Sequence, residues 1–306
     1  MTTPPQPSPG PGSSQTGGTD GRDPGAVPPL PDEAEVVTRL ALGELEVRGR
    51  LVDASNATLF AVATLDGLSM GCVYKPVSGE RPLWDFPART LARREVAAYA
   101  LSSAAGWDVV PPTVLREGPF GPGSVQWWIE SGDPEPNGTP ASPEPGADLV
   151  DVVAPKRLTP GWLMVLRAEG MDGAPLVLAH ADDPALRRMA VFDAVANNAD
   201  RKGGHVLRDR WGRVFGVDHG LTFNTDNKLR TVLWGWAGER LGEELRESVA
   251  RVAADLDGEG QLAATLHGLL RVEEVQRTAR RAADLARSGR FPKPRPGNPS
   301  IPWPAF

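Results

Sequence analysis

The sequence predicts an α+β protein with two lobes, a small β-rich N-terminal lobe with one helix and a larger, mainly α-helical C-terminal lobe. Short apolar segments bounded by turn residues follow one another between residues 45 and 130. After residue 148 most apolar residues recur at helical spacing instead. A stretch rich in Pro, Gly, Asp and Glu, 131–147, separates the two regions and predicts a linker between them.

Pro and Gly mark the ends of these regions. The 306 residues include 31 Pro and 34 Gly, which gather in three segments of low hydrophobicity. Such segments bury too little apolar surface to offset the entropy of ordering them. We therefore predict a disordered tail at 1–32, a disordered linker or insert at 131–147 and a Pro-rich tail at 289–306. The predicted lobes are then residues 33–130 and 148–288.

Charge and composition exclude several classes of function. The net charge is −6 and the Arg residues are scattered among Asp and Glu, so we expect no nucleic-acid partner. Cys72 is the single cysteine, which excludes an internal disulfide and fits a reducing compartment. No apolar run reaches the roughly 18 residues that cross a bilayer. We expect a cytoplasmic protein without a transmembrane segment.

The predicted N-terminal lobe is a short helix followed by a small sheet. The helix covers 34–42, and the five strands cover 45–52, 58–65, 70–74, 109–116 and 124–130. A longer helix is predicted over 87–104, with Asp85 as a candidate cap. Glu95 falls on the apolar line of that helix, which places a carboxylate on the buried face. A buried acid needs a partner.

Helices dominate the predicted C-terminal lobe. They cover a segment around 161–167, and then 184–198, 238–256 and 259–288. Two short strands, 205–208 and 214–217, are joined by a turn and form a predicted hairpin between these helices.

Two polar clusters flank that hairpin. The first is Asn197-Asn-Ala-Asp-Arg-Lys-Gly-Gly-His205, and the second is Asp218-His-Gly220 at the end of an apolar strand. Two acids on adjacent loops are what phosphoryl transfer needs, because one can take the proton of an acceptor hydroxyl while the other binds magnesium. A solvated loop after a helix also favours Asn, Asp and Gly, which is the alternative interpretation of the first cluster.

A lysine from the other lobe supports the first interpretation. Lys75 ends the third predicted strand, and Glu95 lies on the next helix. A strand lysine with an acid behind it orients the phosphates of ATP in kinases. The alternative is an ordinary surface lysine. Ser55, Asn56 and Thr58 lie in and after the turn between the first two strands, where their hydroxyls and backbone N–H groups could also hold phosphates.

This order of motifs resembles the catalytic fold of the phosphatidylinositol 3- and 4-kinases and of bacterial relatives that include HipA-like kinases. The chain resembles more closely an actinobacterial group described as phosphatidylinositol kinase-like, over roughly residues 33–256. The resemblance rests on Tyr74-Lys-Pro76, Pro82-Leu-Trp-Asp-Phe-Pro87, Gly118-Pro-Phe-Gly-Pro-Gly123, Lys228-Leu-Arg-Thr-Val-Leu-Trp234 and the two polar clusters. It implies a bilobal protein-kinase-like fold that uses ATP with Mg²⁺ or Mn²⁺.

The resemblance also assigns roles to single residues. Lys75 would contact phosphate with Glu95 as its partner, Glu130 and its neighbours would form the hinge that contacts adenine, and Asp218 would bind the metal. Asp200, Arg201 and Lys202 form the predicted catalytic set, in which Asp200 is the catalytic aspartate and Lys202 could neutralise the transferred phosphate. His205 stands where these kinases usually have Asn as second metal ligand, and imidazole suits manganese or zinc better than magnesium.

The function predicted from these features is an ATP-dependent kinase that acts on a protein hydroxyl or a small metabolite. A phosphoinositide acceptor follows only from the naming of the family, because only Lys228 and Arg230 are basic in the stretch that follows Asp218. An ATP-binding pseudokinase or scaffold and an enzyme that transfers AMP are the alternatives. We expect His180 and His219 to be structural hydrogen-bonding residues, and the apolar run 232–236 to be core.

Overall fold

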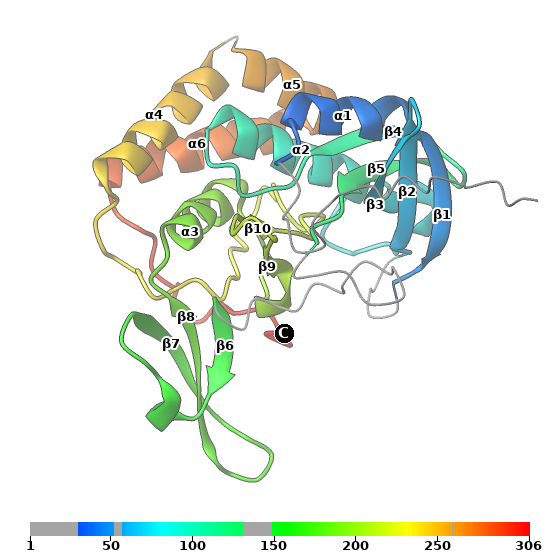
Figure 1. The fold of residues 1–306 in the computed structure, drawn as a ribbon. Coiled ribbons are helices and arrows are strands. Elements are labelled where there is room, and N and C mark those ends of the chain that lie inside the picture. Colours follow the sequence, from blue (N-terminus) through cyan, green and yellow to red (C-terminus); the bar gives the residue numbers. More distant parts are fainter. Residues whose placement is uncertain (1–29, 52–56, 131–148, 259) are drawn as a thin grey trace, which may run out of the picture. The chain divides into compact units, whose positions relative to one another are not determined.

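The computed structural model describes residues 30–51, 57–130, 149–258 and 260–306. Residues 1–29 of the tail predicted at 1–32, and the linker predicted at 131–147, lie outside the described residues. Residues Pro31–Phe306 form one compact unit. In Figure 1 a sheet built from the N-terminal half of this unit lies beside a group of helices from its C-terminal half. The unit therefore has the predicted α+β class.

A five-stranded antiparallel sheet forms the N-terminal half, as the sequence predicts. Its strands are β1 (Glu44–Arg50), β2 (Leu59–Leu65), β3 (Leu68–Pro76), β4 (Thr113–Gly118) and β5 (Gly121–Trp127), in the order β1-β2-β3-β5-β4. Helix α1 (Glu33–Leu42) packs on the sheet with Val36 and Leu40, against Cys72, Tyr74 and Val125. A second helix, α2 (Leu91–Ala104), also belongs to this half, in the region where the sequence predicts the longer helix.

Helix α2 (Leu91–Ala104) is shorter than predicted at its N-terminal end. Arg89 has a left-handed backbone with φ of 64°, so the helix cannot begin before it. The predicted cap was wrong: the carboxylate of Glu80 accepts hydrogen bonds from the N–H groups of Leu91 and Ala92, at 3.1 and 2.9 Å. Asp85 instead forms an ion pair with Lys228 at 2.6 Å.

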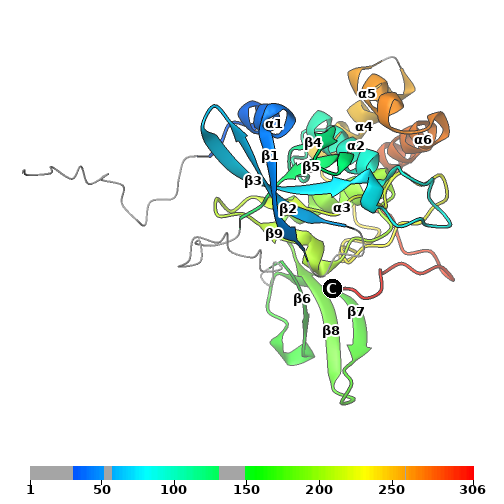
Figure 2. The same ribbon diagram turned by 90° about the vertical axis from the view of Figure 1, so that its right-hand side faces the viewer.

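A second antiparallel sheet replaces the helix predicted around 161–167, which was wrong. It consists of β6 (Val150–Val153), β7 (Trp162–Glu169) and β8 (Pro175–Ala181) in the order β6-β8-β7, and Figures 1 and 2 show it extending away from the rest of the unit. β7 contains good helix formers such as Leu, Met, Arg and Glu. Its pairing with β8, from Trp162 opposite Ala181 to Glu169 opposite Pro175, overrides that local preference.

Helices make up most of the remaining C-terminal half. They are α3 (Pro184–Ala196), α4 (Glu243–Asp257), α5 (Gln261–Leu269) and α6 (Val272–Ser288). The predicted hairpin of β9 (Val206–Arg208) and β10 (Val214–Gly216) lies between α3 and α4. Among the described residues there are also three short 3₁₀ turns, at Val77–Gly79, Pro155–Arg157 and Gly203–His205. The single helix predicted at 259–288 was wrong, because Leu270 has an extended backbone that separates α5 from α6.

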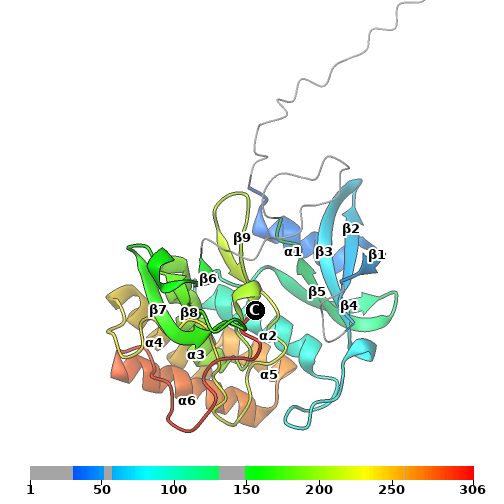
Figure 3. The same cartoon turned by 90° about the horizontal axis from the view of Figure 1, so that it is seen from below.

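The Pro-rich segment 289–306 lies along the C-terminal half, although we expect a tail there. Phe291 is buried and stacks near Trp236, with 5.8 Å between the ring centroids. The Ser300 carbonyl accepts hydrogen bonds from Thr231 N and Trp234 Nε1. Figure 3 shows the segment crossing this half and ending near β9. Its apolar residues and backbone carbonyls hold it in place, which a count of prolines does not predict. The apolar run 232–236 is core, as predicted.

Candidate active site

Four separate segments bring their polar side chains together at one place. They are the end of β3, the middle of α2, the loop after α3 and the loop after β10. The Nζ of Lys75 lies 2.5 Å from Glu95 Oε1 and 2.8 Å from Asp218 Oδ1. Burial alone would lower the pKa of Lys75, but the carboxylates of Asp218 and Glu95 outweigh it and hold that pKa above its usual range. Lys75 is therefore a fixed positive charge between two acids.

Glu95 is buried on α2, as the apolar line of that helix predicts, and both of its oxygens have partners. Oε1 accepts from Lys75, and Oε2 accepts a hydrogen bond of 2.9 Å from the backbone N–H of His219. The neighbouring Arg94 forms a buried ion pair with Glu274 on α6 and donates to the Thr222 carbonyl. These bonds fix α2 to the C-terminal half, so Glu95 holds Lys75 and the loop after β10 in one arrangement.

Asp218 is the exposed member of this group. Its side chain is 53% exposed, whereas that of Glu95 is 3% exposed. Its backbone is left-handed with φ of 60°, a strained conformation that Asp tolerates better than most residues. The Lys75 ammonium holds the pKa of Asp218 well below its usual range. Asp218 therefore presents a permanent carboxylate that a ligand can reach.

The protonation of His205 follows from its two contacts. Its Nδ1 lies 2.9 Å from the backbone carbonyl of Asp200, which can only accept a hydrogen bond, so Nδ1 carries the proton. Burial lowers the pKa of His205 to about 4, although Asp218 acts in the opposite direction. The unprotonated Nε2 therefore lies 3.6 Å from Asp218 Oδ2, so that the imidazole nitrogen and the carboxylate oxygen are two acceptors without a donor between them. A cation between these two atoms would satisfy both.

Such a cation would need further ligands from elsewhere. Among the described residues no group of three or more His, Cys, Asp and Glu side chains gathers in a way that could hold a metal ion. Asp218 and His205 would supply one oxygen and one nitrogen ligand. Divalent cations that bind nucleotides take most of their remaining ligands from phosphate oxygens and water, so two protein ligands fit a metal that arrives with a nucleotide.

Asp200 lies in the turn directly after α3. Its N–H donates to Asn198 Oδ1 at 3.0 Å, and its carboxylate lies 3.6 Å from Lys202 Nζ. Burial raises the pKa of Asp200 to about 6, against the opposing charge of Lys202 and with a smaller contribution from Asp218. A carboxylate with this pKa can take up a proton near neutral pH, which is the property of a general base.

Arg201 does not face this group, which corrects its place in the predicted catalytic set. Its side chain is 0% exposed and forms an ion pair with the fully buried Asp193 of α3, with 3.0 Å between Nη2 and Oδ1. Nη1 donates to the Val217 carbonyl. A Cβ at Gly216 would lie 2.6 Å from this guanidinium, so only glycine fits there. Arg201 therefore positions the loops that carry Asp200 and Asp218.

Sequence reasoning missed the acid at the centre of this arrangement. The carboxylate of Asp193 also accepts hydrogen bonds from Asn198 Nδ2 at 2.8 Å and Thr231 Oγ1 at 3.1 Å. Asp193 lies on the apolar face of α3 among Met189, Ala190 and Ala196. The signal that indicated Glu95, an acid within an apolar helix face, was present here too.

His180 and His219 have structural hydrogen bonds. His219 Nε2 lies 2.7 Å from Arg201 Nη2, which can only donate, so Nε2 accepts. Its Nδ1 is buried without a hydrogen bond in the described residues, 4.0 Å from Glu95 Oε2. His180 contacts the Ala181 carbonyl through Nδ1 and accepts from Gly235 N through Nε2. His180 is structural, as predicted, and His219 joins the Glu95 and Arg201 contacts beneath the site.

The other residues predicted to contact the nucleotide are Ser55, Asn56, Thr58 and Glu130. Ser55 and Asn56 lie outside the described residues. Thr58 is buried just before β2. Glu130 follows β5, where its carboxylate pairs with Arg210 and its carbonyl accepts from Arg210 N–H. Glu130 thus ties the sheet to the β9–β10 hairpin, and its role at adenine stays a prediction.

Comparison with known proteins gives one close relative. A Mycobacterium tuberculosis protein, Rv2133c, is 51% identical over 268 residues, which cover 87% of this chain and 94% of the relative. No family model matches the chain, so the resemblance to phosphatidylinositol kinases stays a prediction. Among solved structures, the Helicobacter pylori proinflammatory kinase CtkA matches 82% of this chain and 94% of its own, with a TM-score of 0.41 and 9% identity. The chain belongs to the family of Rv2133c.

Proposed function

We propose that this chain is an ATP-dependent phosphotransferase whose acceptor is a protein hydroxyl or a small metabolite. The observation that carries the proposal is Lys75, which bonds at once to the buried Glu95 and the exposed Asp218. A fixed cation beside an open, permanently ionised carboxylate suits a bound nucleotide and its metal. Asp200, with its pKa raised to about 6, is the nearby group that could take a proton.

Each residue has a defined part in this reaction. Lys75 would contact phosphate oxygens of ATP while Glu95 holds its ammonium in place. Asp218 and His205 Nε2 would hold a divalent cation, and that cation would neutralise charge on the phosphates. Asp200 would orient the acceptor hydroxyl and take its proton as the oxygen attacks the γ-phosphorus. The bond from that phosphorus to the ADP oxygen breaks, so the products are the phosphorylated acceptor, ADP and protonated Asp200.

The test is transfer of radioactive phosphate from ATP labelled at the γ position, with Mg²⁺ and separately with Mn²⁺, to the protein itself and to a panel of proteins and metabolites. We expect labelling by the wild type and its loss in Asp200→Asn and Asp218→Asn. Asp257→Asn is the matched control, since Asp257 is exposed at the end of α4. Equal labelling by all four proteins would contradict the assignment.

An ATP-binding pseudokinase is the second candidate, because the ligand beside Asp218 is the imidazole of His205 where related kinases usually have an amide. Binding of ATP without transfer under either metal, with an acceptor panel that a known kinase labels, would favour it. Transfer of AMP is separated from transfer of phosphate by the mass added to the product.

A further inference from the structure

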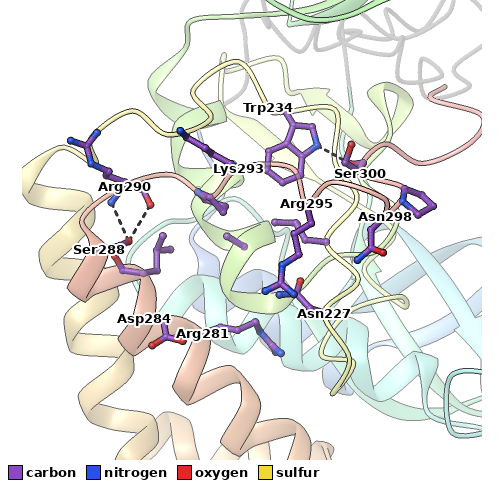
Figure 4. Close-up of a pocket in the computed structure, with 15 residues that line it drawn as sticks. Asn227, Trp234, Arg281, Asp284, Ser288, Arg290, Lys293, Arg295, Asn298 and Ser300 are labelled. Carbon is purple, nitrogen blue, oxygen red and sulfur yellow. Dashed lines mark hydrogen bonds between the residues drawn. The ribbon is translucent and has the colours of Figure 1, made fainter.

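A cavity of about 310 Å³ lies on the C-terminal half, outside the Lys75 and Asp218 group. Its walls come from α6, from the segment 227–234 and from the C-terminal segment 288–300 (Figure 4). Leu229, Trp234 and Pro292 supply an apolar part, and the amides of Asn227 and Asn298 supply polar groups. The cavity is large enough for an organic molecule and offers it both apolar surface and hydrogen bonds.

Its charge is strongly one-sided. Four basic side chains line the cavity, Arg281, Arg290, Lys293 and Arg295, against one acidic lining residue, Asp284. Asp284 already pairs with Arg287, at 2.7 Å, on the exposed surface of α6. Within the described residues, Lys293 and Arg295 form no side-chain hydrogen bond or ion pair. This excess of positive charge stands out in a chain whose net charge is −6.

Arg281 is the half-buried member of this group, whereas Arg290, Lys293 and Arg295 are exposed. Its three nitrogens donate only to neutral acceptors, the carbonyls of Val195 and Asn224 and the hydroxyl of Thr278. Burial, together with the nearby Arg277, lowers the pKa of Arg281 to about 10. A guanidinium in a partly buried position is normally paired with an acid. In Figure 4 Arg281 and Arg295 reach from opposite walls toward the side chain of Asn227.

We propose that this cavity is a second binding site, for an organic phosphate, separate from the candidate active site. The guanidinium groups of Arg281 and Arg295 match a dianionic phosphate better than a monoanionic carboxylate, because a phosphate offers them two negative charges and three oxygens, whereas a carboxylate offers one charge and two oxygens. The indole of Trp234 and the side chain of Leu229 would contact the organic part. The phosphate could belong to a free metabolite or to a phosphorylated side chain of a protein, and the chemistry of recognition is the same.

The cavity also connects to the candidate catalytic loop. The segment 227–234 forms one of its walls, and in that segment Arg230 N donates to the Asn198 carbonyl while Arg201 N donates to the Arg230 carbonyl. The Ser300 carbonyl of the opposite wall accepts from Thr231 N. A ligand in the cavity would therefore contact Leu229, the direct neighbour of the Arg230 that bonds to Asn198 and Arg201.

The test is isothermal titration of the full chain with phenyl phosphate, with benzoate as the carboxylate analogue. We expect binding of phenyl phosphate and at least about tenfold weaker binding to the double variant Lys293→Ala/Arg295→Ala, since charge-assisted hydrogen bonds are lost. Lys156→Ala/Arg157→Ala is the matched control, because it removes the same two charges from an exposed turn elsewhere. Both this control and Lys75→Met should bind like the wild type.

Four results would overturn the proposal. They are no binding to the wild type at millimolar phenyl phosphate, equal weakening in both double variants, equal affinity for benzoate, and loss of binding in Lys75→Met alone. A peptide with a central phosphoserine then identifies the source of the phosphate. Tighter binding of the peptide than of phenyl phosphate indicates a phosphorylated protein, and the reverse order indicates a small organic phosphate.

Discussion

Two acid-centred networks lie side by side in this protein, and they differ in one respect. Asp193 and its partners Arg201, Asn198 and Thr231 are all buried. Glu95 is buried as well, but its partner Lys75 also bonds to Asp218, whose side chain is 53% exposed. The first network is closed to solvent and the second is open at one carboxylate.

This difference in exposure gives the two networks different roles. Asp193 has its carboxylate filled by donors from the protein, so no capacity is left for a ligand. Asp218 has one oxygen on Lys75 and the other near the unprotonated Nε2 of His205, an arrangement that a cation would complete. Buried polar networks that are fully satisfied rigidify a structure, whereas the exposed carboxylate of Asp218 leaves room for a ligand. The closed network thus holds the loops from which the open one is built.

The largest expected effect is on the closed network. Asp193→Ala leaves the buried guanidinium of Arg201 without its acid, which should reduce the free energy of unfolding by about 3–5 kcal/mol. Chemical denaturation measures this. Asp218→Asn is the comparison, and it should change stability by less than about 1 kcal/mol because its carboxylate is exposed. A similar loss of unfolding free energy in the two variants would contradict the division into a buried, structural network and an exposed one.

Glu95→Gln probes the buried acid that serves the open network. The neutral amide leaves Lys75 held by Asp218 alone, and we expect transfer from ATP to fall about tenfold or more, as one tenfold step corresponds to about 1.4 kcal/mol. Stability should fall by about 1–3 kcal/mol, since one buried partner of His219 N–H and Lys75 is weakened. If Glu95→Gln lowered stability but left the rate of transfer from ATP unchanged, Glu95 would be a structural residue like Asp193.

The pH dependence tests Asp200. Transfer needs its carboxylate unprotonated, so the rate should rise about tenfold per pH unit below the pKa of about 6 and level off above it. The stability of the folded protein should change with pH in the opposite direction. Because the folded protein binds this proton more tightly than the unfolded chain, stability should fall as pH rises from about 4 to about 6. Denaturation across that range, with Asp200→Asn as control, checks this; a rate that is flat from pH 5 to 7 would contradict the role.

The smallest effect concerns the choice of metal. His205→Asn replaces a nitrogen ligand with an amide oxygen, which magnesium prefers. We expect the ratio of transfer rates with Mn²⁺ and Mg²⁺ to fall by a few-fold, on the order of 1 kcal/mol, since one ligand of several changes. An unchanged ratio would place His205 outside the coordination shell.

The sequence predicts this comparison in part. An acid on an apolar helix face needs a partner, which predicts Glu95, and an acid at the end of an apolar strand predicts Asp218. Asp193 satisfies the same criterion as Glu95, so the sequence contains the signal for it. The position of Arg201 next to Asp200 predicts a catalytic residue, whereas its burial depends on contacts with α3 and on the space left by Gly216. Such contacts between distant segments leave no local pattern.

Parts of the fold escaped prediction for a related reason. The strand β7 is composed of helix formers and becomes a strand only through its pairing with β8. The segment 289–306 is rich in Pro, yet its Ala305 carbonyl accepts from Gly203 N in the candidate catalytic loop. In both cases contacts with another segment override local composition: for β7 that segment is the next strand of the chain, and for 289–306 it is the distant loop that holds Gly203.

Binding of ATP by calorimetry, with and without Mg²⁺ or Mn²⁺, tests the central claim most directly. The open network should bind ATP only with a divalent cation, and both Lys75→Met and Asp218→Asn should lose about tenfold or more in affinity, because each removes a charge that, in our proposal, contacts the nucleotide or its metal. The control Asp257→Asn should bind like the wild type. Metal-independent binding, or equal affinity in all four proteins, would contradict the account.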